Sequence, residues 1–417
     1  MANKRIYLCL AHMSDEGLEQ KYIKEAFDTN WVVPLGPNVN GFEKDLEVFV
    51  GKNKRVVALS AGTAAVHLAL IACGVGPGDE VCVQSFTFCA SSHPITYLGA
   101  TPVFIDSEKD TWNMDPELLE QAILDRKAKT GRYPKAIVPV ALYGMPYKVD
   151  RIMEIADKYG IPVVEDAAEG FGSKFNGQVL GTFGKYGVLS FNGNKMITTS
   201  GGGALITANE EEWREIMMYA TQYRESYPYY QHEKIGYNYR MSNICAGIGR
   251  GQMTVANDHI AHHKHVQKLY EDLLKNVPGV HVHSQPATGE YDSNYWLCTI
   301  TIDDDVKIKG QENAYKSVVK GAVGGAAGVI HIADSATTDC QPNDNVEALR
   351  VFMDSSGIEA RPVWKPMHKQ PVYKNSPAYV NGVSEAVFKV GMCLPAGPYV
   401  TDEDVKYIVE TIKSAIV

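Results

Sequence analysis

The sequence lacks the features that mark nucleic-acid-binding, membrane-spanning and secreted proteins. Its 417 residues carry a formal net charge of −9 at pH 7, whereas a nucleic-acid partner requires a basic face. No apolar run approaches the ~20 residues that span a bilayer, and the N-terminus shows no long apolar region followed by a small-residue cleavage site. We therefore expect a cytoplasmic protein with no nucleic-acid partner and no membrane association.

Paired cysteines are also missing. None of the eight cysteines stands in a CxxC pair, and most lie in apolar surroundings. This pattern predicts reduced core cysteines rather than a disulfide framework or a zinc site, and it leaves a catalytic cysteine as a weak alternative. The eight are Cys9, Cys73, Cys82, Cys89, Cys245, Cys298, Cys340 and Cys393.

A histidine-rich stretch also lacks what a metal site needs. His262, His263 and His265 follow one another closely, but the spacing supplies no fourth ligand of the right kind. We expect these histidines to lie on a solvated helix face, and we expect no metal.

What the sequence does contain is an alternation of short apolar strands and helices after Arg55. Such alternation predicts an α/β domain with a mostly parallel sheet covered on both faces, in which ligands bind at the C-terminal strand ends. The expected strands are Val56–Leu59, Glu80–Val83, Pro102–Ile105, Ala136–Val140, Pro162–Val164, Val188–Phe191 and Ala204–Thr207. The expected helices are 14–29, 41–50, 63–73, 116–127, 148–159 and a stretch after Phe88, with the loop TNWVVPLGPNV separating the first two.

The chain is long enough for a large domain and a smaller one. We place the large domain at 1–253 and a smaller C-terminal α/β domain at 254–417, with a long helix at His259–Leu274 near its start. A Gly- and Ala-rich stretch within 303–345 is expected to be a surface insertion packed on the smaller domain.

Lys195 stands on a tight turn between two expected strands, in the stretch SFNGNKMITTSGGG from Ser190 to Gly203. A lysine in that position cannot lie in water like a surface lysine. Desolvation or a nearby cation can free its amine to attack a carbonyl, which is the chemistry of a Schiff-base lysine. The alternative is an ordinary loop lysine, and the other strand ends decide between the two.

Two strand ends offer an anion site and an aromatic surface. After the first strand, the small-residue turn Ser60–Ala65 opens a helix, and the free N–H groups there fit a phosphate. An ordinary capped helix start is the alternative. After the second strand come Phe86 and Phe88. Aromatic residues there are usually core, but one could stack on a planar ring.

Acidic residues follow a third expected strand. Glu165, Asp166 and Glu169 follow Pro162–Val164, and a buried carboxylate needs a partner. That partner is either a protonated pyridine nitrogen or a structural Arg or Lys. A phosphate site, an aromatic plate, a buried carboxylate and a lysine are together the groups that pyridoxal phosphate requires.

The motifs that carry these residues resemble the DegT-type sugar aminotransferases, a family of fold-type I pyridoxal phosphate enzymes. The resemblance covers nearly the whole chain. Within the family, the chain most resembles enzymes that aminate C4 of a UDP-4-keto-6-deoxy-N-acetylhexosamine, the bacillosamine-type branch. The motifs are NWVVPLGPNVNGFEKDL, LSAGTAAVHLAL, FTFCAS, EDAAE, SFNGNKMITTSGGG, GYNYRMSNICAGIGRGQ, RPVWKPMHKQPVY and GMCLPAGPYVT.

The resemblance implies roles for the core of the site. Lys195 would form the Schiff base with the cofactor and then move the proton during the reaction. Asp166 would pair with the pyridine nitrogen, and Phe88 would stack on the ring. The residues implied to hold the cofactor phosphate are Gly62, Thr63 and Ser190.

The resemblance also implies a two-chain site with nucleotide-sugar contacts. Asn238 would reach the phosphate of the neighbouring subunit, so that the active sites lie at a homodimer interface. His368 and the N-terminal loop near Trp31 would face the nucleotide sugar. The implied reaction is ping-pong transfer of nitrogen from an amino acid, glutamate, to the keto sugar.

Glu169 departs from many relatives, which have Gln or His near the cofactor's phenolic oxygen. Two neighbouring anions repel, so Glu169 must be protonated, turned away or paired with a cation. The bacillosamine-type branch uses Glu at this position, which favours the UDP-sugar reading.

Three rival functions remain. Some relatives are sugar dehydratases, but these have histidine in place of the lysine. A catalytically silent regulator that binds the cofactor is a second rival, and an aminotransferase for a dTDP- or GDP-linked keto sugar is a third. Fold and family do not by themselves determine the substrate.

Overall fold

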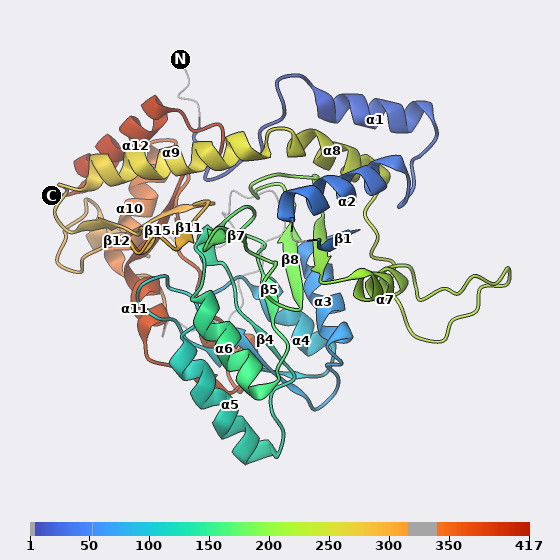
Figure 1. Ribbon diagram of the computed structural model, residues 1–417. Coiled ribbons are helices and arrows are strands. Elements are labelled where there is room, and N and C mark those ends of the chain that lie inside the picture. Colours follow the sequence, from blue (N-terminus) through green and yellow to red (C-terminus); the bar gives the residue numbers. More distant parts are fainter. Residues whose placement is uncertain (1–4, 52, 316–339) are drawn as a thin grey trace.

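The computed structural model describes residues 5–51, 53–315 and 340–417. Figure 1 shows one sheet on the right with helices around it, a second sheet on the left, and the long helix α9 (Ala256–Leu274) running above both. No helix in these ranges is both long and apolar enough to cross a membrane.

The first sheet is mixed and mostly parallel. Its strands lie in two hydrogen-bonded groups, β14-β3-β2-β4 and β1-β9-β8-β5. Parallel bridges Ile137↔Val163 and Val140↔Asp166 join β4 to β5 across the middle, and β9 runs antiparallel to both of its neighbours. The strands are β1 (Arg55–Leu59), β2 (Glu80–Gln84), β3 (Thr101–Ile105), β4 (Ala136–Val138), β5 (Val164–Asp166), β8 (Tyr186–Ser190), β9 (Gly203–Thr207) and β14 (Ala378–Tyr379).

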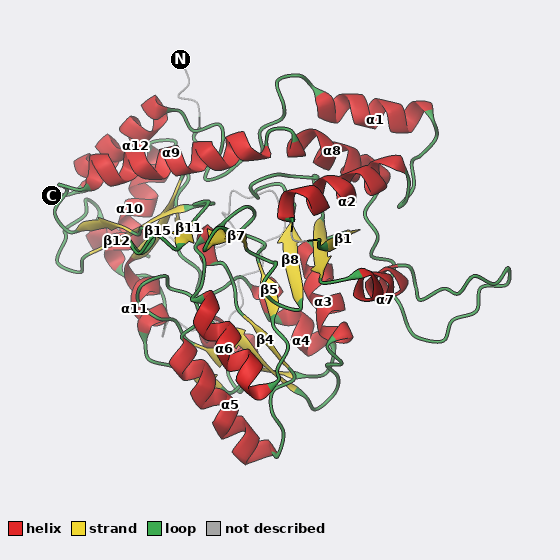
Figure 2. Ribbon diagram, viewed as in Figure 1, coloured by secondary structure: helices red, strands yellow, loops and turns green. Residues whose placement is uncertain are grey.

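Both faces of this sheet are buried, because alternate residues of each strand point to opposite sides. In β1, Val57 and Leu59 share a core with α3 and α7, whereas Val56 and Ala58 belong to the core that also contains residues of α2, α5 and α6. Figure 2 shows helices on both sides of the strands, as a parallel sheet requires. The helices are α2 (Pro37–Val50), α3 (Gly62–Ala72), α4 (His93–Tyr97), α5 (Pro116–Thr130), α6 (Val149–Tyr159) and α7 (Glu210–Ala220).

The N-terminal helices pack against the helix that precedes α9. α1 (Leu18–Asp28) and α2 both contact α8 (Asn243–Met253). Asn243 Oδ1 accepts hydrogen bonds from the N–H groups of Asn38 and Val39, at the start of α2. This cap starts α2 at Pro37, inside the stretch that the sequence analysis assigned to an extended loop, so that boundary was wrong.

The second sheet is antiparallel and has its own core. Its strand order is β10-β12-β15-β13, and its apolar residues pack with the second half of α9 and with α10 and α12. Ile6, which pairs with Ile358, and Ile308, which pairs with Ile416, are buried in this core. The elements are β10 (Val280–Val282), β12 (Cys298–Ile302), α10 (Asp344–Ser355), β13 (Arg361–Pro362), α11 (Val383–Val390), β15 (Gly391–Leu394) and α12 (Asp402–Ala415).

The sequence analysis predicted neither helix α7 nor helix α8, and it missed two features of the sheets. A small sheet joins a hairpin to a distant strand, and β14, from the C-terminal part of the chain, adds to the edge of the first sheet. The small sheet contains β6 (Lys174–Phe175), β7 (Gln178–Val179) and β11 (Tyr291–Asp292), and 3-10 turns span Cys89–Ser91, Leu142–Gly144, Gln311–Asn313, Met367–Lys369 and Pro371–Tyr373.

The expectation for the histidines of α9 needs correction. His263 is fully buried and is not on a solvated face. His265 is exposed and pairs with Asp402. Among the described residues, no group of three or more His, Cys, Asp or Glu side chains could hold a metal ion.

The predicted domain boundary at 253/254 stays a prediction, although Ile6 packs in the second core. The predicted insertion lies partly outside the described residues. Ile308, near its start, belongs to the second core.

Candidate active site

Lys195 lies in the turn after β8, where its side chain is only 13% exposed. Its Nζ is 3.4 Å from Glu169 Oε1 and 4.0 Å from the centroid of the Trp296 ring. The amine therefore lies between a carboxylate and an aromatic face, and it is not an ordinary loop lysine in water.

Glu169 is buried and accepts a second hydrogen bond. The N–H of Tyr143 donates to its Oε2 at 2.7 Å. Burial raises the pKa of the Glu169 carboxyl, and the Lys195 charge opposes that rise. The sequence allowed Glu169 to be protonated, turned away or paired with a cation. The structure pairs it with the Lys195 amine, and burial raises its pKa, which favours protonation.

Asp166 is a buried carboxylate on which the Lys195 charge acts from beyond ion-pair distance. Ser91 Oγ donates to its Oδ2 at 2.7 Å, and the N–H of Ala168 donates to its Oδ1 at 3.1 Å. No ion pair among the described residues involves Asp166, and burial raises its pKa. The described residues therefore contain no ion pair between Asp166 and a structural Arg or Lys, which was the alternative.

Gly62 and Ser190 meet where α3 begins beside the end of β8. A Cβ added to Gly62 would lie 3.0 Å from Ser190 Cβ and 3.2 Å from Ser190 Oγ. No side chain caps the start of α3, so its first N–H groups remain available to an anion. Thr63 follows in the first turn, so the three residues lie together at the start of α3. Their role in holding a phosphate stays a prediction.

The two aromatics after β2 take different positions. Phe86 is fully buried, whereas Phe88 is 48% exposed and contacts Trp364, with ring centroids 5.3 Å apart. The N–H of Trp364 donates to Tyr143 Oη at 2.7 Å, and Tyr143 also bonds Glu169. Phe88 is thus the aromatic residue with an exposed ring. Its contact with Trp364 connects it through Tyr143 to the Glu169 carboxylate.

These groups fit pyridoxal phosphate. The uncapped start of α3 with Gly62 suits the phosphate, and the unpaired buried Asp166 suits a protonated ring nitrogen. Phe88 offers a ring face, and Lys195 offers an amine. On this fold, such a set defines the site of a pyridoxal phosphate-dependent enzyme.

Three predicted residues are not brought to this set within one chain. Trp31 is 39% exposed in an apolar loop, and Asn238 is exposed at the base of an arm that projects beyond α7 (Figure 1). His368 is buried, with Nδ1 2.7 Å from Ser85 Oγ and Nε2 3.2 Å from Glu385 Oε1. Their roles stay predictions.

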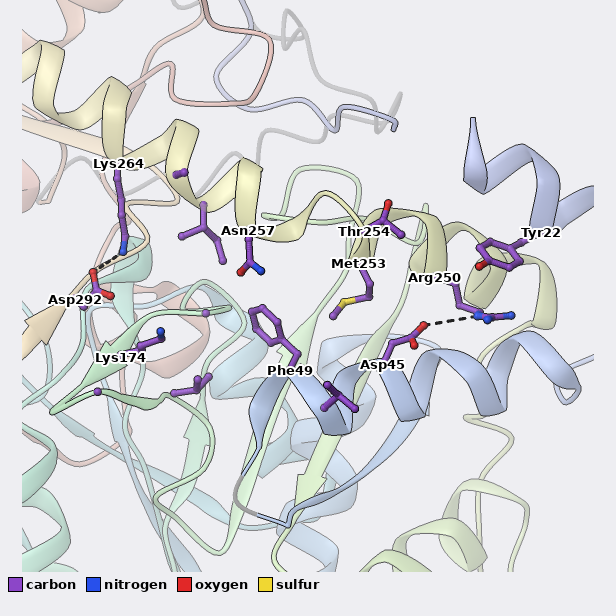
Figure 3. A pocket seen from close by; sticks show the side chains of 16 residues that line it. Tyr22, Asp45, Phe49, Lys174, Arg250, Met253, Thr254, Asn257, Lys264 and Asp292 are labelled. Atoms are coloured by element: carbon purple, nitrogen blue, oxygen red, sulfur yellow. Dashed lines mark hydrogen bonds and ion pairs between the residues drawn. The ribbon is translucent and has the colours of Figure 1, made fainter. Parts of the chain in front are cut away.

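A large hollow of about 850 Å³ lies elsewhere, between α2, the α8–α9 junction and β6–β7 (Figure 3). No residue predicted for the site lines it. Phe49 points into the hollow and stacks on Phe171, which also packs against Phe191. These rings lie between the hollow and the Lys195 turn. Ion pairs within the hollow are Asp45–Arg250 and Lys264–Asp292.

Four residues of the site were missed from the sequence. Ser91 comes three residues after Phe88, in a motif already singled out, and could have been suspected as a donor. Trp364 stands in the quoted motif RPVWKPMHKQPVY, whereas nothing local marks Tyr143 or Trp296. All three come from distant segments and contact the site only through the fold.

Comparison with known proteins gives the same class. The model of the DegT/DnrJ/EryC1/StrS aminotransferase family matches residues 14–321 and 327–413. The chain belongs to this family, and it is a pyridoxal phosphate-dependent aminotransferase.

Two relatives match this chain along almost its entire length. EpsN of Bacillus subtilis (strain 168), whose name provisionally describes a pyridoxal phosphate-dependent aminotransferase, is 42% identical over 98% of this chain and 95% of its own. GDP-perosamine synthase of Escherichia coli O157:H7 is 33% identical over 97% of this chain and 98% of its own.

A relative that matches over a shorter stretch and a solved structure are also similar to this chain. UDP-2-acetamido-2-deoxy-3-oxo-D-glucuronate aminotransferase of Pseudomonas aeruginosa is 36% identical, over 58% of this chain and 65% of its own. A DegT DnrJ EryC1 StrS aminotransferase from Brucella abortus superimposes with a TM-score of 0.81 and 28% identity, over 96% of this chain and 95% of its own.

Proposed function

We propose that this enzyme transfers the amino group of glutamate to C4 of a UDP-4-keto-6-deoxy-N-acetylhexosamine. The observation that carries the chemistry is Lys195 Nζ held 3.4 Å from Glu169 beside the unpaired Asp166. The sugar assignment rests on the sequence motifs SFNGNK, TTSGGG and EDAAE and on Glu169.

When bound, pyridoxal phosphate supplies an electron sink that makes a hydrogen on the amine-bearing carbon acidic. Lys195 Nζ takes up that proton and delivers it again, because it is the one amine placed among the described site residues. Glu169 Oε1 holds the protonated amine between the two transfers. Asp166 supplies the negative charge that keeps the ring nitrogen protonated.

Two neighbouring groups bind the cofactor without taking part in proton transfer. The N–H groups at the start of α3 hold the phosphate, where the helix dipole favours a negative charge. Phe88 covers one face of the ring. Ser91 fixes Asp166 Oδ2, so the carboxylate keeps its direction while its charge stays free.

We place the complete site at the interface of a homodimer. The arm between α7 and α8 exposes Tyr227, Tyr229, Tyr230 and Ile235, more apolar surface than a lone chain favours. Asn238 at its base then reaches the partner's phosphate cradle, and the exposed Trp31 loop and the segment of His368 face the nucleotide sugar. We assign the enzyme to the cytoplasm.

A GDP-linked keto sugar is the second candidate substrate. It is favoured by the 33% identity, over almost the full length, to a GDP-perosamine synthase. The Pseudomonas relative named for a UDP sugar matches a shorter stretch, so similarity alone does not choose between the two nucleotides.

The test offers UDP-, GDP- and dTDP-linked 4-keto-6-deoxy sugars to the holoenzyme with [15N]glutamate, followed by mass spectrometry and NMR of the products. We expect a 15N-labelled amine at C4 of the UDP-linked N-acetyl sugar and no product from Lys195→Ala. Product from the GDP sugar alone would favour the second candidate and would contradict the UDP assignment.

A further inference from the structure

The backbone carbonyls on either side of Lys195 are both held by distant side chains. Trp296 Nε1 donates to the carbonyl of Asn194 at 2.7 Å. On the other side, His259 Nδ1 lies 3.2 Å from the carbonyl of Met196. A carbonyl oxygen only accepts, so Nδ1 of His259 carries the hydrogen.

The ring of Trp296 also covers the lysine side chain. Its centroid is 4.0 Å from Nζ, and a tryptophan face attracts a cation at that distance. Trp296 is almost fully buried, so the indole has little freedom to leave. One residue therefore contacts Lys195 through both its backbone turn and its amine.

The two side chains that bond these carbonyls, Trp296 and His259, are both connected to α9, the helix that joins the two cores. Ile260 belongs to the first core and Val266 to the second. His259 is on this helix, and one turn further His263 Nδ1 lies 3.1 Å from the carbonyl of Tyr295, next to Trp296.

Both histidines act as neutral donors. Burial lowers the pKa of His259 and brings the pKa of His263 to about 3. The contact of His263 with Tyr295 therefore keeps its neutral form at neutral pH, and burial favours the same form of His259.

We propose that Trp296 and His259 are positioning residues of the transamination, which fix the Lys195 turn from both sides and hold its amine toward the cofactor carbon. They act through Lys195, and they connect its placement to the helix between the cores. The inference rests on the proposed role of Lys195 and not on the identity of the sugar.

The first test uses apoprotein and no substrate. Pyridoxal phosphate is added, the mixture is quenched with borohydride at intervals, and the reduced adduct on Lys195 is quantified by peptide mass spectrometry. We expect Trp296→Leu to form the adduct at least about tenfold more slowly, since small misplacements of a reacting group are costly. Trp296→Phe keeps a ring face and loses the Nε1 bond, so it should fall between Trp296→Leu and the wild type.

The second test separates positioning from general damage to the fold. His259→Asn keeps an N–H donor and should retain most of the adduct rate, whereas His259→Leu should lose at least about tenfold. In the glutamate half-reaction the rate constant should fall for the Leu variants while the apparent KM for glutamate stays within about threefold.

Trp213→Phe is the matched control. Trp213 Nε1 also donates to a backbone carbonyl, that of Val56, and Arg55 lies over its ring, but it lies on α7, outside the site. Wild-type adduct rates in folded Trp296→Leu and His259→Leu would overturn the proposal. If either Leu variant does not fold, a wild-type adduct rate in Trp296→Phe overturns it. Failure of all variants and wild type alike to form the Lys195 adduct would instead refute the role of Lys195.

Discussion

Glu165 and Asp166 are neighbours on β5, and both are buried, yet among the described residues Glu165 accepts more backbone N–H groups than Asp166 does. Three backbone N–H groups donate to Glu165, from Gly181, Phe183 and Gly184. Asp166 receives one hydroxyl and one N–H and has no ion pair among the described residues. One carboxylate therefore serves the fold, and the other keeps its charge available for a ligand.

This difference predicts opposite effects of two similar substitutions. Asp166→Asn should lower kcat/KM by about 100-fold, the scale of losing one charge that stabilises the transition state, with little change in Tm. Glu165→Gln should turn an amide toward backbone N–H donors and cost about 1–3 kcal/mol of stability. Thermal unfolding and steady-state kinetics on both variants check this, and a stable, fully active Asp166→Asn would mean that the charge has no role.

The cradle at the start of α3 predicts a defect in cofactor retention. In Gly62→Ala the new methyl group would press on Ser190, and the dissociation constant for pyridoxal phosphate should rise about tenfold, which is about 1.4 kcal/mol. Gly76→Ala, where nothing lies within 4 Å of the new Cβ, is the control. Titration of apoprotein followed by absorbance measures both, and equal affinities would remove Gly62 from the cradle.

Burial of His263 predicts a pH dependence of stability. Its pKa is about 3 in the folded protein and about 6.5 when unfolded. Above pH 6.5 both states are neutral there, so this residue has no effect on stability. Between pH 6.5 and 3 only the unfolded state binds the proton, so stability falls as the pH falls, by up to about 1.4 kcal/mol per unit.

Urea unfolding from pH 7 to pH 4 tests this for His263→Asn. The slope of unfolding free energy against pH should be shallower in this variant than in wild type by about 1 kcal/mol per unit. An unchanged slope in His263→Asn would show that His263 takes up its proton in the folded state.

The proposed two-chain site predicts complementation between inactive variants. Asn238→Asp should repel the partner's cofactor phosphate, and Lys195→Ala lacks the amine. A mixed dimer of the two has one site with both lesions and one with neither. Co-refolding at equal amounts should restore about one quarter of wild-type activity, because about half of the dimers are mixed.

Native mass spectrometry provides the control for that experiment. Mixed dimers without activity would mean that each site is built from one chain. Asn238 is preferable to Arg240 as the altered residue, because Arg240 bonds Glu43 and the carbonyl of Ala58 within its own chain. Its loss would damage the fold directly.

The sequence could predict those parts of the site that follow a strand within a few residues. Lys195, Asp166, Gly62 and Ser190 are such residues, since strand and turn patterns are local. Trp296 could not be predicted, because its contact with Lys195 depends on how β12 and α9 meet the first core. Local sequence does not encode that contact.

The fold shows the same limit. The alternation of strands and helices was sufficient for the first sheet, but the edge strand β14 comes from a segment more than 250 residues after β3 along the chain. His263 was assigned to a solvated helix face because the spacing of His262, His263 and His265 supplies no fourth metal ligand. In the structure, the carbonyl of Tyr295 and the second core lie against it, and tertiary packing overrides the local pattern.

The most direct test of the account is the half-reaction with glutamate alone. Purified holoenzyme is mixed with excess [15N]glutamate and no sugar, and 2-oxoglutarate is measured against the number of active sites. The account predicts one 2-oxoglutarate per site and then no more, loss of the reaction in Lys195→Ala, and release of the stored 15N only when a keto sugar is added. Absence of 2-oxoglutarate from cofactor-loaded wild-type enzyme, or undiminished formation in Lys195→Ala, would contradict it.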